Sequence, residues 1–252
     1  MKIVVSFKVV SDDQDIQVSG DGSLDFSKAH KIVSAYDLNA KEAAAQLAAA
    51  NEGASVVGVT VGDAKIDDSK LKKNVLARGV DELFMTADDA CADMDAHATA
   101  AALADLLGKV GEYDLILCGD GSADNYAQQV DVQLAAKLGL PVVNGAAKIE
   151  LGAGVATVER VLEDVVETVE VPLPAVISVV PDVALPRIPG MKDILAAGKK
   201  PMNVSAADGA YAAALEVVDC KAPEQADRKL EIIDASEDGA IEKFAAAIKA
   251  AL

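Results

Sequence analysis

The sequence predicts an α/β protein with a doubly wound, mostly parallel sheet, helices on both faces, an antiparallel extension and a C-terminal arm. Two observations carry the parallel part: strand-like and helix-like segments alternate up to Pro141, and glycine or proline ends several of them. The composition agrees, since 52% of the 252 residues are hydrophobic and only 3% are aromatic. We therefore expect a core of Ala, Val, Leu and Ile.

The part of the chain before Pro141 reads as four strand–helix repeats. Strands are expected at residues 2–9, 55–61, 83–85 and 114–118, and helices at residues 35–51, 63–78, 95–107 and 125–138. Ser34 and Asp37 mark the start of the first helix, and Asp63 is a candidate N-cap for the second. Hairpin-like punctuation, Ser-Gly-Asp-Gly at 19–22, lies between the first strand and the first helix.

After Pro141 the pattern changes. Strand-like segments follow one another without long helices between them, at residues 148–151, 155–162, 167–171 and 175–180. We expect these segments to form antiparallel hairpins or an edge extension of the sheet. A loop at 181–190, a short helix at 192–198 and an amphipathic helix at 241–252 complete the chain, which divides into an α/β domain (1–204) and an arm (205–252).

Charge and composition exclude several classes of function. A formal net charge of −18 opposes binding to nucleic acid or to an anionic membrane surface. No apolar run approaches the length of a membrane span, and the N-terminus begins a strand rather than a signal peptide, so we expect a cytoplasmic protein. Three widely spaced cysteines and two histidines offer no disulfide framework, metal site or catalytic triad. We expect no catalytic residues and no metal.

The most informative motif is GDGSADNYAQQV at 119–130, which follows the apolar run 115–118. Glycine lets a ligand approach the backbone closely, and the start of the following helix favours a phosphate. A strand, a glycine turn and a helix in this order are typical of nucleotide sites in parallel sheets. The alternative is that Asp120, Asp124 and Asn125 only form a solvated polar turn. A calcium loop is disfavoured because the spacing of acidic residues does not fit.

Over nearly its whole length the chain resembles the β subunit of electron transfer flavoproteins. Besides the 119–130 loop, the resemblance rests on MKIVVSFKVV (1–10), YDLNAKEA (36–43), TVERVLEDVVETVEVPLPAVISV (157–179) and PRIPGMKDILAAGKKP (186–201). The segments at 21–29 and 115–130 are most similar to the branch associated with anaerobic carnitine metabolism, which is related to nitrogen-fixation electron-transfer proteins.

The resemblance implies an electron carrier rather than an enzyme. The expected protein is a heterodimer whose α subunit holds a redox-active FAD, while this chain binds a second nucleotide, either AMP or a second FAD. Its partners would be the α subunit and acyl-CoA-type or other flavin dehydrogenases. The expected cofactor-binding residues are Ser6, Ser34, Ala35, Tyr36, Asp37, Val61, Gly119, Asp120, Gly121, Ser122, Ala123, Asp124, Asn125, Tyr126, Ala127, Gln128, Gln129 and Val130.

The loop departs from the family pattern at two places. Asp120 and Gly121 stand where members often carry a basic residue and Gln, and residues 128–130 read Gln-Gln-Val instead of Asn-Gln-Thr. Binding would therefore depend on backbone donors and amides rather than on cations. The choice between AMP and FAD stays open.

A second functional region, at 184–200, corresponds to the family's recognition loop for dehydrogenases. The expected partner-binding residues are Arg187 and Met191, with Met191 as the apolar anchor. The alternative is a Pro-rich connection whose Met191 packs on its own domain. Glu159 and Arg160 serve either the α-subunit interface or an ion pair on a strand. For the whole chain, the alternative is a stand-alone adenine-nucleotide-binding protein or hydrolase with a related fold.

Overall fold

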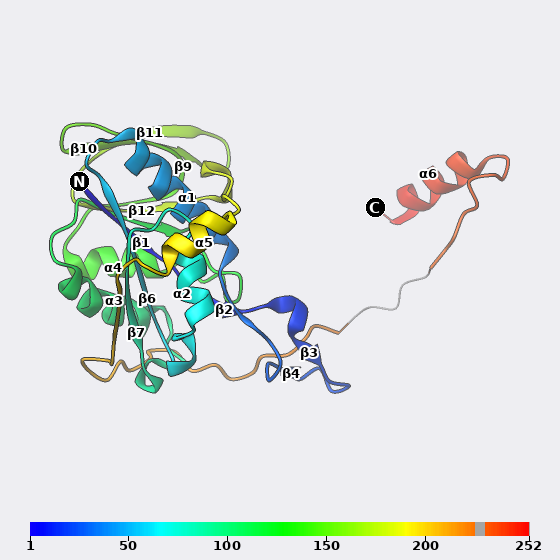
Figure 1. The fold of residues 1–252 in the computed structure, drawn as a ribbon. Coiled ribbons are helices and arrows are strands. Elements are labelled where there is room, and N and C mark those ends of the chain that lie inside the picture. Colours follow the sequence, from blue (N-terminus) through cyan, green and yellow to red (C-terminus); the bar gives the residue numbers. More distant parts are fainter. Residues whose placement is uncertain (225–229, 252) are drawn as a thin grey trace. The chain divides into compact units, whose positions relative to one another are not determined.

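The computed structural model describes residues 1–224 and 230–251. It divides the chain into a first unit, Met1–Gln17 with Asp25–Asp219, and a second unit, Val18–Leu24 with Cys220–Leu252. The first unit contains the large sheet and its helices (Figure 1).

The sheet of the first unit is mixed and mostly parallel. Its strands are β1 (Lys2–Ser6), β6 (Ser55–Gly62), β7 (Glu82–Ala87), β8 (Leu115–Gly119), β9 (Val142–Leu151), β10 (Val155–Val161), β11 (Val166–Pro172), β12 (Ala175–Val179) and β13 (Met202–Ser205). They lie in the order β11-β10-β9-β12-β8-β1-β6-β7-β13. From β1 the chain builds outward to β6 and β7 and then returns, so that β8 pairs with the other side of β1. This reversal opens a crevice at the carboxyl ends of β1 and β8.

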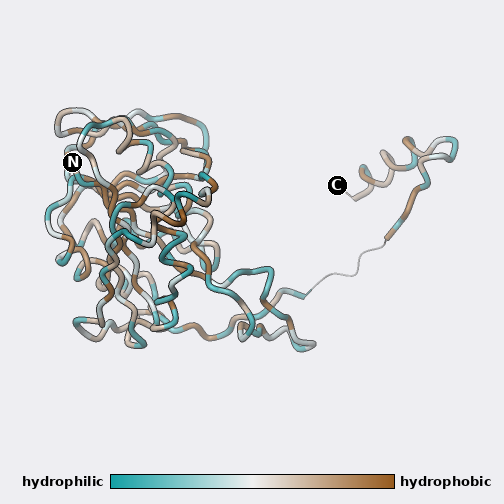
Figure 2. The backbone as a smooth tube through the Cα atoms, in the orientation of Figure 1, coloured by the Kyte–Doolittle hydropathy of each residue, from teal (hydrophilic) through white to brown (hydrophobic). Residues whose placement is uncertain are grey.

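Helices cover both faces of the sheet, which confirms the predicted fold class. They are α1 (Ala35–Ala50), α2 (Ser69–Leu76), α3 (Ala96–Val110), α4 (Val130–Leu138) and α5 (Met191–Ala197). Successive residues of a strand face opposite sides, so Ile3 and Val5 pack in the core with α1, α2 and α5, while Val4 packs with α3 and α4. Hydrophobic residues, brown in Figure 2, concentrate along the central strands. Both cores are aliphatic, as the composition predicts.

The antiparallel extension is confirmed for β9, β10 and β11, which pair as consecutive hairpins. The expectation is wrong for residues 175–180, because β12 lies inside the sheet and pairs parallel with both β8 and β9. All five residues of β12 are buried. A strand that is covered on both faces requires a continuous apolar run. The sequence of β12, Ala-Val-Ile-Ser-Val, is such a run except for its serine.

Several predicted boundaries are corrected. The strand expected at 148–151 begins at Val142, and the loop expected at 181–190 opens with a 3₁₀ turn at Pro181–Val183. The first strand ends at Ser6, and residues Val9–Ser11 form a separate strand, β2, which pairs with β5 (Lys31–Val33). The second helix is two pieces: Asp63 caps a 3₁₀ turn at Ala64–Ile66, and Asp68 caps α2 through the N–H of Leu71. The helix expected from residue 125 begins at Val130, so the preceding residues form a longer loop.

The remaining short elements agree with the sequence pattern. The punctuation at 19–22 turns the chain between β3 (Gln17–Val18) and β4 (Leu24–Asp25), where Gly22 has a φ of +81°. In the second unit, α6 (Ala240–Ala251) forms the amphipathic helix expected at 241–252. Residues 225–229 and 252 of the predicted arm lie outside the described residues. Among the helices that the structure describes, none is long and apolar enough to cross a membrane.

Candidate functional site

A pocket opens at the carboxyl edge of the sheet, where β1 and β8 end beside the first residues of α3 and α4. It leaves about 790 Å³ of empty space, including space open to solvent. Among the predicted cofactor-binding residues, those that line it are Ser6, Asp37, Val61, Gly119, Asp120, Gly121, Ser122, Asn125, Ala127, Gln128, Gln129 and Val130. Segments far apart in the sequence therefore meet at the crevice that the strand order creates.

The other predicted cofactor-binding residues do not line the pocket. Ser34 supports the loop, since its Oγ accepts the N–H of Ala123 at 3.2 Å. The rings of Tyr36 and Tyr126 contact each other with centroids 5.0 Å apart. Asp124 forms an ion pair with Lys8, and Ala35 is the first residue of α1.

Asp37 ties three elements together beneath the pocket. It lies in the first turn of α1, and its carboxylate accepts the N–H of Lys8 at 2.7 Å and the N–H of Gly119 at 3.1 Å. Burial raises the pKa of Asp37 to about 6, although the two N–H groups and the nearby lysines act in the opposite direction. This side chain fixes the ends of β1 and β8 relative to the start of α1.

The loop between β8 and α4 is held mainly by polar contacts. The N–H of Asp120 donates to the carbonyl of Val179 at 3.0 Å, and the hydroxyl of Tyr126 donates to Oδ2 of Asp120 at 2.9 Å. Tyr126 and Gln128 both have positive φ values, 45° and 53°. A Cβ on Gly121 would lie 2.2 Å from Cδ2 of Tyr126, so this closed arrangement needs glycine there.

Unused hydrogen-bonding groups gather in the pocket. Within the described residues, the backbone N–H groups of five lining residues donate to no protein acceptor: Gly121, Ser122, Ala127, Gln128 and Gln129. Oδ1 of Asp120 is buried and has no hydrogen-bond partner. Free N–H groups beside the start of α4 suit an anion, and the unpartnered carboxylate oxygen suits a hydroxyl or amino group. The site thus offers both kinds of contact that a nucleotide requires.

The charge of the pocket is mostly negative. Of the lining residues, all of which are described, only Lys8 is basic, and its Nζ lies 2.7 Å from Asp124. Burial acts to raise the pKa of Asp124, but hydrogen bonds from Lys8 and Ser122 outweigh it and lower that pKa. An anion in this pocket would depend on backbone amides, as the departures from the family pattern predict.

Sequence reasoning missed part of the lining. These residues are Phe7, Lys8, Met94, Asp95, Ala96, Thr99, Leu103, Cys118 and Asp131. Lys8 interrupts an otherwise apolar run, and that interruption is a signal that the strand ends before it. Burial raises the pKa of the Cys118 thiol well above its usual value, so this cysteine lines the wall as an unreactive group.

The predicted partner-binding residues lie outside the pocket, around the start of α5. Met191 is 75% exposed, so it does not pack on its own domain. Arg187 forms an ion pair with Glu42 of α1, with Nε and Oε2 2.6 Å apart. Glu159 pairs with Lys148, and Arg160 contacts Asn144 and Glu167, so both residues take part in contacts between neighbouring strands.

The fold and the pocket define a doubly wound α/β protein with a pocket at the switch point of its sheet. The family model for the electron transfer flavoprotein domain matches residues 22–210, most of the chain. The chain belongs to the electron transfer flavoprotein family, which confirms the resemblance at the level of the family. Proteins with this domain are flavin-associated electron carriers rather than enzymes.

Proposed function

We propose that this chain is the β subunit of a heterodimeric electron transfer flavoprotein. In this proposal the α subunit holds the redox-active FAD, and this chain binds AMP or a second FAD in the pocket at the carboxyl edge of its sheet. The observation that carries the proposal is the set of free N–H groups in the 119–130 loop, beside a buried oxygen of Asp120 that has no partner. We place the nucleotide-binding domain at 1–204 and the α-subunit-binding arm at 205–252.

The residues of the pocket fit a nucleotide. The N–H groups of Gly121, Ser122 and residues 127–129 would hold phosphate oxygens, and Asp120 would accept a hydrogen bond from ribose or adenine. Phe7 and Leu103 supply apolar wall on which a planar ring can pack. Flavin, when bound, supplies the one- and two-electron chemistry. The chain's own residues bind and orient the nucleotide.

The surface around α5 supports the docking of a dehydrogenase. Leu185, Ile188 and Met191 are all more than 70% exposed, although large apolar side chains of this kind are usually buried. We propose that these side chains contact acyl-CoA-type or other flavin dehydrogenases, with Met191 as the anchor. The proposed setting is the cytoplasm, in anaerobic metabolism of carnitine-type compounds.

Co-expression with a candidate α subunit tests the assignment. We expect a stable yellow heterodimer that releases AMP or a second equivalent of FAD when it is denatured and analysed by mass spectrometry. The chain alone should contain little flavin, because the redox-active FAD is proposed to lie mainly on the α subunit. A colourless monomer that hydrolyses ATP would contradict the proposal and favour the stand-alone alternative.

A further inference from the structure

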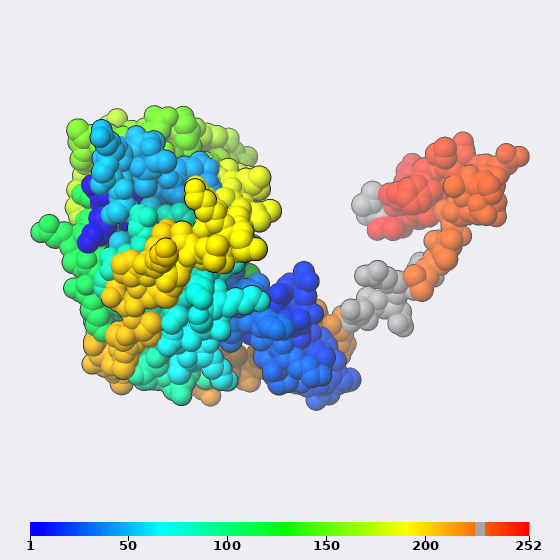
Figure 3. Space-filling view, viewed as in Figure 1, coloured from blue at the N-terminus to red at the C-terminus, as the bar shows by residue number. Residues whose placement is uncertain are grey.

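The loop from Pro181 to Gly190 reverses the usual placement of side chains. Leu185 and Ile188 point into solvent and are 89% and 92% exposed. Arg187, between them, turns toward the body of the first unit. Val183 and Ala184 pack against the core at the start of the loop, but from Leu185 to Ile188 the apolar side chains are exposed, so polar contacts must hold this part in place. In Figure 3 the yellow atoms, which include this loop and α5, lie on the surface beside the blue and cyan atoms of the segments that contain α1 and α2.

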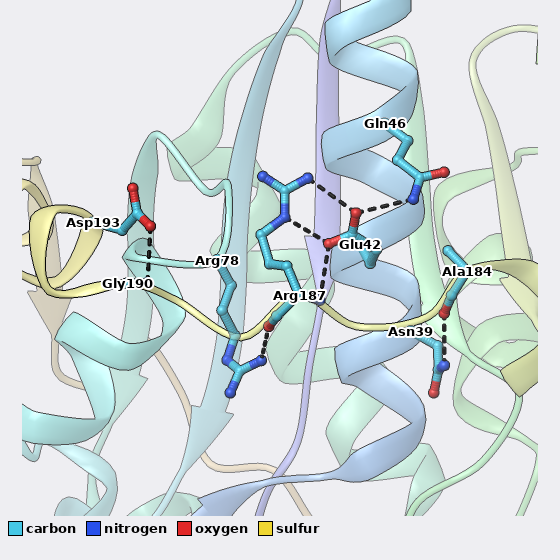
Figure 4. Close-up of polar contacts among 8 residues, drawn as sticks. All are labelled: Asn39, Glu42, Gln46, Arg78, Ala184, Arg187, Gly190 and Asp193. Carbon is cyan, nitrogen blue, oxygen red and sulfur yellow. Dashed lines mark hydrogen bonds and ion pairs between the residues drawn. The ribbon is translucent and has the colours of Figure 1, made fainter.

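Side chains of α1, together with Arg78 just after the end of α2, hold the loop at both ends (Figure 4). Nδ2 of Asn39 donates to the carbonyls of Pro181 and Ala184, each at 2.8 Å. The carboxylate of Glu42 accepts three hydrogen bonds from Arg187: from Nε at 2.6 Å, from Nη2 at 3.0 Å and from the backbone N–H at 3.2 Å. Nη1 of Arg78 donates to the carbonyl of Arg187 at 2.5 Å.

The centre of this grip is partly buried and shaped for the guanidinium group. The side chain of Glu42 is only 8% exposed. Burial raises its pKa, but hydrogen bonds from Arg187 and Gln46 outweigh burial, so the pKa of Glu42 lies below its usual value. A Cβ on Gly79 would lie 2.6 Å from Cβ of Ala45 and 3.3 Å from Nη1 of Arg187. Glycine at this position leaves room for the planar, two-pronged contact.

We propose that Glu42 and Arg187 are positioning residues, which hold the 184–190 loop in the conformation that a partner dehydrogenase recognises. This inference rests on the proposed function, and it assigns Arg187 a role different from direct contact with the partner. A loop that is ordered before binding loses less conformational freedom when the complex forms. The grip keeps Leu185 and Ile188 presented to solvent, where a partner can bury them.

Glu42→Gln tests the proposal in the purified heterodimer, with an acyl-CoA dehydrogenase reduced by its substrate as the probe. The variant keeps the size of the side chain and leaves Arg187 in place, so it breaks the charge pair without removing the arginine. We expect KM for the dehydrogenase to rise roughly 3- to 10-fold with kcat little changed, since each side chain freed at an interface contributes a few-fold. Hydrogen exchange at 184–190 should become faster.

Controls separate positioning from general damage. Glu52→Gln makes the same charge change just after the end of α1 and should leave KM and exchange unchanged. Reduction by dithionite and nucleotide content should be the same in all variants. If Glu42→Gln lowers stability too far, Asn39→Ala releases the other end of the loop without exposing a buried charge, and it should give the same pattern.

A double-mutant cycle and single variants of the exposed apolar residues show whether the positioning role or the docking surface itself is wrong. If Glu42 acts through the loop, its effect on KM should be smaller in a Met191→Ala background than in the native chain. If Leu185→Ser and Ile188→Ser raise KM but neither Glu42→Gln nor Asn39→Ala does, the positioning role is overturned and the docking surface stands. If Leu185→Ser, Ile188→Ser and Met191→Ala all leave KM unchanged, the docking part of the proposed function fails as well.

Discussion

Gly121 shows most directly how one residue controls the pocket. Its missing side chain leaves room for the ring of Tyr126, whose hydroxyl bonds Asp120 and whose ring contacts Tyr36. Any larger residue would displace that ring and, through the hydrogen bond of its hydroxyl, would also displace Asp120. The loop would then lose the arrangement that exposes its free N–H groups.

We predict that Gly121→Val lowers the amount of nucleotide that purifies with the heterodimer by at least several-fold, without unfolding the sheet. Mass spectrometry of the denatured complex measures the occupancy, and circular dichroism checks the fold. Gly108→Ala is a suitable control, because Gly108 lies in α3 with nothing near its Cβ position. That change should stabilise the chain by about 0.5–1 kcal/mol. Full occupancy in Gly121→Val would remove this loop from the site.

Lys41 is a second residue with an unusual environment. It is completely buried on α1, its Nζ has no hydrogen-bond partner within the described residues, and it lies 4.3 Å from the centre of the Phe7 ring. Burial lowers the pKa of Lys41 to about 7, although the negative charge of Asp37 acts to raise it. In the unfolded chain its pKa would be near the ordinary value of 10.5.

This difference predicts the pH dependence of stability. Between about pH 7 and 10.5 the unfolded chain holds a proton on Lys41 that the folded chain has lost. Because the folded pKa is the lower one, raising the pH favours the folded state by at most about 1.4 kcal/mol per pH unit for this one group. Lys41→Met should remove that contribution and raise the free energy of unfolding at pH 7. Urea unfolding at pH 7, 8 and 9 measures the free energy of unfolding of both proteins. If the idea is wrong, this free energy changes equally with pH in the native chain and in Lys41→Met.

At the scale of elements, the start of α3 connects the pocket to the segment that follows β13. Asp95 caps α3 through the N–H of Ala98 at 2.8 Å, and its other oxygen accepts the N–H groups of Ala214 and Leu215 at 2.7 and 3.0 Å. The same residue lines the pocket. The carboxylate of Asp95 therefore binds both the start of α3 and the backbone at residues 214 and 215.

We predict that Asp95→Ala destabilises the first unit by about 1–2 kcal/mol, as loss of a helix cap does, and speeds hydrogen exchange at residues 214 and 215. Asp68→Ala is the matched control, since Asp68 caps α2 through Leu71 alone. It should lower stability to a similar extent but leave exchange at 214 and 215 unchanged. Equal exchange in both variants would show that Asp95 does not hold this segment.

At the scale of the whole molecule, the proposed assembly depends on α6. Ile241, Phe244 and Ile248 are spaced along one side of this helix and are all exposed in the described chain. An apolar stripe of this kind needs a surface to pack on, and we propose the α subunit as that surface.

Replacing Ile241 and Phe244 together by Ser should weaken the heterodimer at least 10-fold, since each large apolar side chain contributes about 1.5–3 kcal/mol when buried. The sheet of the first unit should remain folded, because its cores contain neither residue. Size-exclusion chromatography at micromolar concentration measures the association, and Lys249→Gln provides a control in the same helix. Unchanged association in the double variant would assign the arm another role.

The sequence alone determined the class of fold and most helix and strand positions, and the resemblance to the family pointed to just over half of the pocket lining. Local rules suffice for the helices and strands, because apolar periodicity, caps and glycines act over a few residues. Asp95 as the cap of α3 and Gly139 as the end of α4 follow these rules. The 119–130 loop could be found because glycine and helix-start residues directly follow a buried strand. The resemblance then connected these features to one family.

Only the tertiary structure decided which distant residues meet. The parallel position of β12, the contact of Asp37 with Lys8 and Gly119, and the grip of Glu42 on Arg187 join segments that the sequence separates by 29 to 145 positions. No local pattern specifies such pairs, because they depend on the order of strands in the sheet. The delayed start of α4 has the same origin: hydrogen bonds of the 119–130 loop to Ser34 and Val179 hold the loop in a non-helical path, with positive φ values at Tyr126 and Gln128, against its local tendency to begin a helix.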